Sequence, residues 1–130
     1  FLPQSCVFPS QFECLDFSFT GDEQLDNAAD EDKIRFKLVN SIGEPLQVED
    51  VTISNDAGLI CNTLTDPAAL PSDWAAGDEK DFTFSNCKDG VFLVDERVDA
   101  RITLTYCAPA TYNCPPHIIY GKINGIVNPP

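Results

Sequence analysis

Six cysteines are the residues of this 130-residue sequence that most directly indicate chemistry. None stands in a C-x-x-C pair, and the chain has only one histidine to complete a zinc site. An even number of cysteines without metal-ligand spacing indicates disulfides and an oxidising compartment, with reduced or metal-bound thiols as the alternative. Pairing neighbours along the chain predicts three bridges, Cys6–Cys14, Cys61–Cys87 and Cys107–Cys114.

A second candidate for chemistry is the stretch at residues 21–32, GDEQLDNAADED, which we call the acidic segment. Calcium takes several carboxylate oxygens as ligands, so the candidate ligands here are Asp22, Asp26, Asp30 and Asp32. The segment lacks the D-x-[DN]-x-[DN]-G spacing and the closing Glu of an EF-hand. A solvated acidic loop and a calcium loop both stay open, and we expect no other cofactor or metal.

The sequence contains no recognisable catalytic motif. His117 is the only imidazole, and it follows two prolines in an apolar stretch, where a structural or surface role is the expectation. There is no G-x-S-x-G, no glycine-rich phosphate loop and no H-E-x-x-H. We therefore expect that the protein is not an enzyme.

Charge is distributed unevenly along the chain. The formal net charge is −13, which disfavours nucleic acid and anionic membranes as partners, because both require clustered Lys and Arg. Residues 101–130 contain two basic residues and no acidic one. An apolar, slightly cationic end on an acidic chain suggests attraction to the chain's own acidic part or to a neighbouring copy. No stretch is apolar over the length of a membrane span.

Alternation of apolar and polar residues predicts that several stretches of the chain form β-strands. In 33–40, KIRFKLVN, the residues Ile34, Phe36 and Leu38 alternate with basic ones, and residues 15–19 alternate in the same way. Further strands are expected at 46–54, 59–64, 80–86, within 91–106 as one strand or two, and at 117–127. We predict a single all-β domain over 1–130, an immunoglobulin-like antiparallel β-sandwich of seven to eight strands stapled by disulfides.

Two surface features have more than one interpretation. The basic face of residues 33–40 is either solvated or a docking surface for a neighbour's acidic segment, and we expect it to be solvated. Trp74, the only tryptophan, lies in the irregular stretch 65–79. It is either a lid over the edge of the core, which we favour, or an exposed anchor for a partner.

Four segments carry a resemblance to a known family. They are the cysteine-rich start PQSCVFPSQFECLDFSF, the basic strand and turn KIRFKLVNSIGEPLQV, the tryptophan loop SDWAAGDEKDFTF, and a final TLTY followed by Cys and HIIYGKI. In this order they resemble the globular β-sandwich domain of archaeal type IV pilin-like proteins. The resemblance implies a structural protein at the cell surface. Pilins start with a long apolar helix that this sequence lacks, so we expect Phe1 to follow a removed segment or the chain to be another kind of extracellular subunit.

We therefore expect a structural subunit of an extracellular filament or pilus-like appendage, with identical subunits as partners. Assembly by donor-strand complementation would use residues 1–12 or 117–130, which carry no acidic residue. The alternative is a monomeric secreted module that binds a ligand or surface through loops such as 65–79. The side chains expected at the subunit interface are apolar and are Leu2, Val7, Phe8, Ile123, Ile126 and Val127.

Overall fold

The computed structural model describes residues 3–21, 32–88 and 91–129. These residues form ten β-strands and no helix, so none of them belongs to a helix long and apolar enough to cross a membrane. The strands are β1 (Ser5–Val7), β2 (Phe12–Thr20), β3 (Lys33–Asn40), β4 (Leu46–Asn55), β5 (Gly58–Leu59), β6 (Cys61–Asp66), β7 (Ser72–Trp74), β8 (Glu79–Cys87), β9 (Arg97–Cys107) and β10 (His117–Asn128).

Alternation of apolar and polar residues sets the two faces of these strands, because successive side chains point to opposite sides. In β3 the residues Ile34, Phe36 and Leu38 are fully buried, as the sequence predicts. Strand β2 departs from its expected pattern. A register shift between Cys14 and Asp16 interrupts its pairing with β3, and Leu15 is left 44% exposed.

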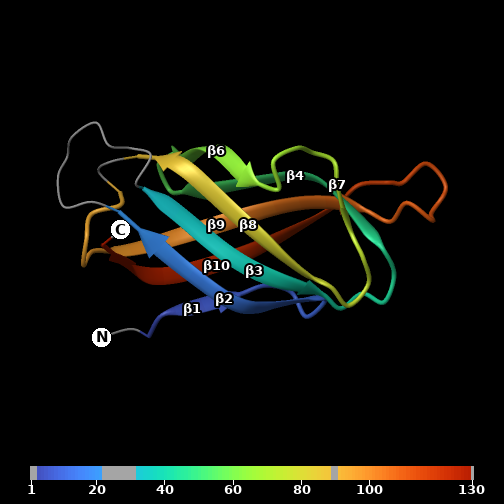
Figure 1. The fold of residues 1–130 in the computed structure, drawn as a ribbon, viewed down its shortest axis with the longest axis horizontal. Coiled ribbons are helices and arrows are strands. Elements are labelled where there is room, and N and C mark those ends of the chain that lie inside the picture. The colour runs from blue at the N-terminus through green and yellow to red at the C-terminus, as the bar shows by residue number, and fades with distance from the viewer. Residues whose placement is uncertain (1–2, 22–31, 89–90, 130) are drawn as a thin grey trace.

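The strands join into one highly curved, nearly closed sheet (Figure 1). Eight of them follow the order β5-β4-β9-β10-β2-β3-β8-β6, while β1 pairs with β10 and β7 pairs with β4. Every pairing is antiparallel except the short one between β10 and β2, where Val127 and Asn128 lie beside Phe19 and Thr20. Near the two ends of this path, strands β4 and β6 lie close to each other. The expectation of an all-β fold is confirmed.

Aromatic side chains fill the interior of the curved sheet. The ring of Phe36 stacks on those of Phe82 and Phe8, with centroids 5.2 and 5.7 Å apart. Trp74 is only 2% exposed, and its indole Nε1 donates a hydrogen bond to the backbone oxygen of Asp78 at 2.8 Å. Trp74 is therefore part of the core and not an exposed anchor.

A buried amide fixes the turn that follows β3. The Asn40 side chain has no exposed surface, and its Nδ2 donates to the backbone oxygen of Glu44 at 2.9 Å. Its Oδ1 accepts from the backbone nitrogen of Ile42 at 3.0 Å. Because a buried polar group without partners costs free energy, these bonds tie residues 41–45 to the end of β3.

Two glycines in β10 allow aromatic rings to lie against the strand. A Cβ on Gly121 would come within 2.3 Å of the Phe8 ring, and one on Gly125 within 2.7 Å of the Phe19 ring. Any side chain at these positions would overlap those rings. The glycines therefore bring the residues after β1, and strand β2, into close contact with β10.

Three disulfides link the cysteines as Cys6–Cys14, Cys61–Cys87 and Cys107–Cys114, the pairing that the sequence favours. The first joins the β1 strand to β2, the second links directly opposite residues of β6 and β8, and the third closes the β9–β10 loop. In the chain-entropy account, each such loop stabilises the fold by roughly 2.5 to 3.5 kcal/mol.

Candidate functional site

Strand β10 has one edge that is only partly paired. Residues Lys122 to Asn124 pair with β1, and Val127 and Asn128 pair with β2. Residues 117–121 pair with β9 on the opposite edge. On the β1 side, no other described strand pairs with them. We call residues 117–121 the open edge; β1 ends at Val7, which lies opposite Lys122, the next residue after this edge.

The backbone groups of the open edge that point outward can be identified from their neighbours. The Ile126 amide donates to Gln4 Oε1 at 3.1 Å, and the Asn128 oxygen accepts from the Gly21 amide at 3.0 Å, both on the β1 and β2 side. Val127 bonds on the other side, to Glu96 and Asp95. Because these directions alternate along a strand, Ile118 and Tyr120 direct their N–H and C=O groups out of the open edge.

The side chains of the same two residues are exposed on the outer face of the sheet. Ile118 is 55% exposed and Tyr120 is 69% exposed, and Val7 at the end of β1 is 62% exposed. The nearest outward neighbours on β9 are Thr105 and Thr103, which oppose Ile118 and Tyr120. The open edge thus combines unpaired backbone groups with apolar surface and carries no carboxylate.

The side chains expected at a subunit interface lie in different environments. Val7 is exposed, Phe8 packs partly buried over Gly121, and Ile126 is half-buried. Ile123 and Val127 have no exposed surface and belong to the core of their own chain. Leu2 lies outside the described residues. Strand β10 is therefore engaged within its own sheet and cannot be donated to a neighbour without exposing that core.

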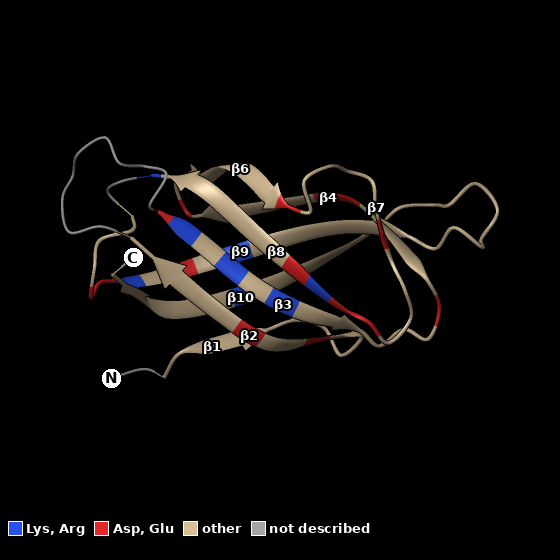
Figure 2. Ribbon diagram, viewed as in Figure 1, with Lys and Arg blue, Asp and Glu red and all other residues tan. Residues whose placement is uncertain are grey.

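The basic face of β3 is compensated within the chain, as Figure 2 shows by the red residues on the flanking strands β2 and β8. Arg35 contacts Asp16 at 2.8 Å and Asp81 at 3.2 Å, and Lys37 lies 3.8 Å from Glu79. These ion pairs are partly exposed, so each contributes little to stability. They leave Arg35 and Lys37 already paired, which argues against a docking role for this face.

The acidic segment is mostly outside the described residues, including Asp22, Asp26 and Asp30. Asp32 is described; it is fully buried and takes part in interactions of its own.

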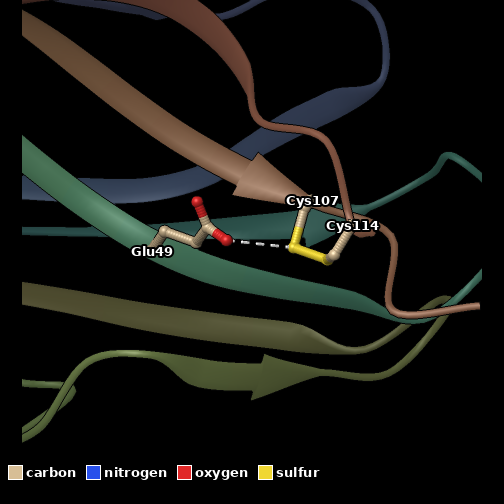
Figure 3. A group of neighbouring side chains, drawn as sticks. All are labelled: Glu49, Cys107 and Cys114. Atoms are coloured by element: carbon tan, nitrogen blue, oxygen red, sulfur yellow. Dashed lines mark hydrogen bonds between the residues drawn. A yellow bond between two sulfur atoms is a disulfide. The ribbon is translucent and has the colours of Figure 1, made fainter. Parts of the chain in front are cut away.

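Glu49, Cys107 and Cys114 bring three groups of metal-binding type together (Figure 3). Glu49 lies at the register shift between Val48 and Asp50 in β4, and its Oε1 is 3.2 Å from Cys107 Sγ. Both sulfurs belong to a disulfide, so neither offers a thiolate to a metal ion. This group therefore does not fit a metal site while the bridge is intact.

His117 packs against an aromatic ring. Its imidazole stacks on Tyr106 with centroids 5.4 Å apart, and the two residues are directly opposed on β10 and β9. Burial, and then the carboxylate of Glu44, raise the pKa of Tyr106 above its ordinary value. The Tyr106 hydroxyl therefore stays protonated at neutral pH.

A broad depression of about 850 Å³ lies on the outer face of β9 and β10. Asp99, Arg101, Lys122 and Asn124 line it together with the turn at 55–57 and the stretch before β9. Arg101 is directly opposite Lys122 and contacts Asp56 at 2.7 Å. The depression thus holds charges of both signs in an otherwise acidic protein.

Comparison with known proteins gives little guidance. No family model matches the chain, and no curated protein matches it. A solved structure, described as the crystal structure of the C-terminal domain of wzt, is similar with a TM-score of 0.43 and 14% sequence identity. The match covers 96% of this chain and 78% of that one. A likeness of this size carries no argument about fold or function.

Sequence reasoning did not single out the open edge. The signal for it is the pair of consecutive apolar residues Ile118 and Ile119, because a strand must place one of two neighbours outward. The half-buried Ile119 faces the interior and Ile118 faces solvent.

Proposed function

We propose that this protein is a structural subunit of an extracellular filament or pilus-like surface appendage, assembled by contacts between identical subunits. The observation that carries the proposal is the open edge with its exposed apolar side chains Val7, Ile118 and Tyr120. Exposed sheet edges of this kind pair with other chains unless charge or covering segments prevent it.

The charge distribution supports self-association at this face. Burying an unpaired carboxylate costs several kcal/mol, so a surface without acidic residues is favourable for contact between copies of an acidic protein. Residues 101–130 have none, although the chain has 21 in total. The open edge lies within this acid-free segment, so two copies can meet there with little repulsion between carboxylates.

The fold that we infer for this role is an immunoglobulin-like sandwich. One layer would hold β1, β10, β9 and β4, and the other β2, β3, β8 and β6, as their pairings allow. Three disulfides suit a subunit that works in an oxidising environment outside the cell. Because β10 is engaged in its own core, assembly by packing and edge pairing fits better than donation of residues 117–130.

The test is the size of the purified protein. Light scattering across a concentration series and negative-stain microscopy should show assemblies that grow with concentration. A strictly monomeric protein at the highest concentration reached, with no filaments on the grid, would reject the proposal.

The second candidate function is a monomeric secreted binding module, and the depression beside Arg101 and Lys122 favours it. The stretch 65–79 is a poorer candidate for ligand contact, because Trp74 is buried. A module of this kind would remain monomeric. Anionic ligands would then raise its melting temperature, and Lys122→Ala would lose that response.

A further inference from the structure

We propose that the open edge pairs with the same open edge of a second copy, in antiparallel orientation, so that one sheet continues across a two-fold axis. This inference rests on the proposed self-association and names one surface that mediates it. A two-fold contact closes on itself and joins subunits in pairs, so growth of a filament needs a second contact on another surface. Residues 117–121 are the longest part of β10 that no described strand pairs with on the β1 side.

The backbone supports one register. If the two-fold axis passes through Ile119, Ile118 of one copy lies opposite the partner's Tyr120. Ile118 and Tyr120 are the residues whose N–H and C=O groups point out of the edge, so this register forms four hydrogen bonds between the two strands. If the register shifted by one residue, the outward N–H and C=O groups of one strand would lie opposite residues whose own groups point to β9. None of the four hydrogen bonds would then form.

Side chains on the outer face match this register. Ile118 would pack beside the partner's Tyr120, and the symmetry repeats the contact, so that both exposed apolar side chains of each copy become covered. Aromatic side chains opposite branched ones are favourable cross-strand pairs. Residues 118–121 of each strand bring no Asp, Glu, Lys or Arg into the contact, since they are Ile, Ile, Tyr and Gly.

The ends of the open edge limit how far two copies can overlap. Beyond Gly121 this side of β10 is occupied by β1, whose last residue, Val7, lies opposite Lys122. Before His117 the chain has two prolines, which cannot donate to a ladder. The contact is therefore short, and we expect it to be weak in solution and visible only at high protein concentration.

A second copy fits this edge better than an unrelated acidic or basic partner does. The edge has no Asp, Glu, Lys or Arg to attract such a partner, but it is complementary to itself in backbone pattern and in apolar surface. The rest of the acidic chain would repel a copy that approached in most other orientations.

Amide hydrogen exchange followed by NMR on the intact, disulfide-bonded chain tests the inference. The amides of Ile118 and Tyr120 should exchange quickly in dilute protein and slow at least severalfold as the concentration rises. The amides of Ile119 and Gly121 point to β9 and should be slow at every concentration.

Two variants and a control complete the test. Tyr120→Pro removes an N–H that has no partner among the described residues, and Ile118→Lys places a charge in the contact; both should reduce the concentration dependence of size. Tyr112→Ser removes an aromatic side chain that is 87% exposed in the loop before β10, and it should associate like the parent. Melting curves identify any variant that does not fold.

Two results would overturn the inference in different ways. If the protein associates while the Ile118 and Tyr120 amides exchange at the same rate at all concentrations, another surface is used and the filament proposal stands without this contact. If the protein is monomeric throughout, both the contact and the proposed function fail.

Discussion

Adding one methyl group to β10 should disturb the segment that follows β1. In Gly121→Ala the new Cβ would lie 2.3 Å from Cε2 of the Phe8 ring, well inside a normal carbon contact. The ring or the strand must move, and overpacking of this kind costs about 1 to 3 kcal/mol. With an unfolding entropy of about 2.1 cal/mol/K per residue, this free energy corresponds to a fall in melting temperature of roughly 4 to 11 °C.

A double-mutant cycle shows whether Phe8 is the cause. Phe8→Ala alone should cost about 2 kcal/mol, because this partly buried ring loses its packing on Phe36. In the double variant the methyl group enters space that the ring has left, so the cost of Gly121→Ala should largely vanish. The two changes should therefore be coupled by about 1 kcal/mol or more.

The measurement is urea unfolding without reductant, so that the three disulfides remain in both states. Gly125→Ala is the matched control, since its Cβ would meet the buried Phe19 ring and not Phe8. Its cost should be unchanged by Phe8→Ala. Additive costs for Gly121→Ala and Phe8→Ala would refute the contact between this ring and β10.

Four further predictions can be tested on the same protein. Replacing Cys61 and Cys87 by Ala should lower the unfolding free energy by about 3.5 kcal/mol, more than loss of either shorter bridge, because this disulfide closes the longest loop; denaturant unfolding measures the difference, and the intact parent should weigh six hydrogens less than its reduced form. Asn40→Ala should destabilise by about 2 to 4 kcal/mol, since it leaves turn backbone groups without their partner; Asn62→Ala, at an exposed position of β6, gives the comparison. The raised pKa of Tyr106 means that the folded state binds the hydroxyl proton more tightly than the unfolded state does. This contribution to stability is complete below the ordinary tyrosine pKa and is lost as the pH rises through the pKa of the folded state. An ultraviolet titration should show a tyrosine that ionises at raised pH, and this late step should be absent from Tyr106→Phe. If the acidic segment binds calcium, millimolar calcium should raise the melting temperature in a saturable way, whereas equal melting in calcium and in chelator would leave the solvated loop.

Local features of the structure follow from the sequence because they depend on near neighbours. The alternation of β3 places Ile34, Phe36 and Leu38 inside, since side chains alternate along any strand. The cysteine pairs at the two ends of the chain are separated by only 8 and 7 residues, so proximity favours each bridge. The all-β class follows from the same patterns.

The tertiary structure decided the features that depend on contacts between distant segments. Leu15 reads as an inward residue, but the register shift in β2 exposes it. Ile123 and Val127 read as residues available to a neighbour, but the place of β10 between β9 and β2 uses them in the chain's own core. Strand pairing over long separations is set by how the whole interior packs, and no local pattern records it.

The open edge shows the same division within a single strand. The sequence shows that residues 117–121 are apolar and free of acidic groups. Only packing decides that β1 is three residues long and stops at Val7. Packing also decides that the Phe8 ring then lies against Gly121. Composition therefore determined that this segment carries no acidic group, and the length of β1 determined which of its backbone groups are left unpaired by the described strands.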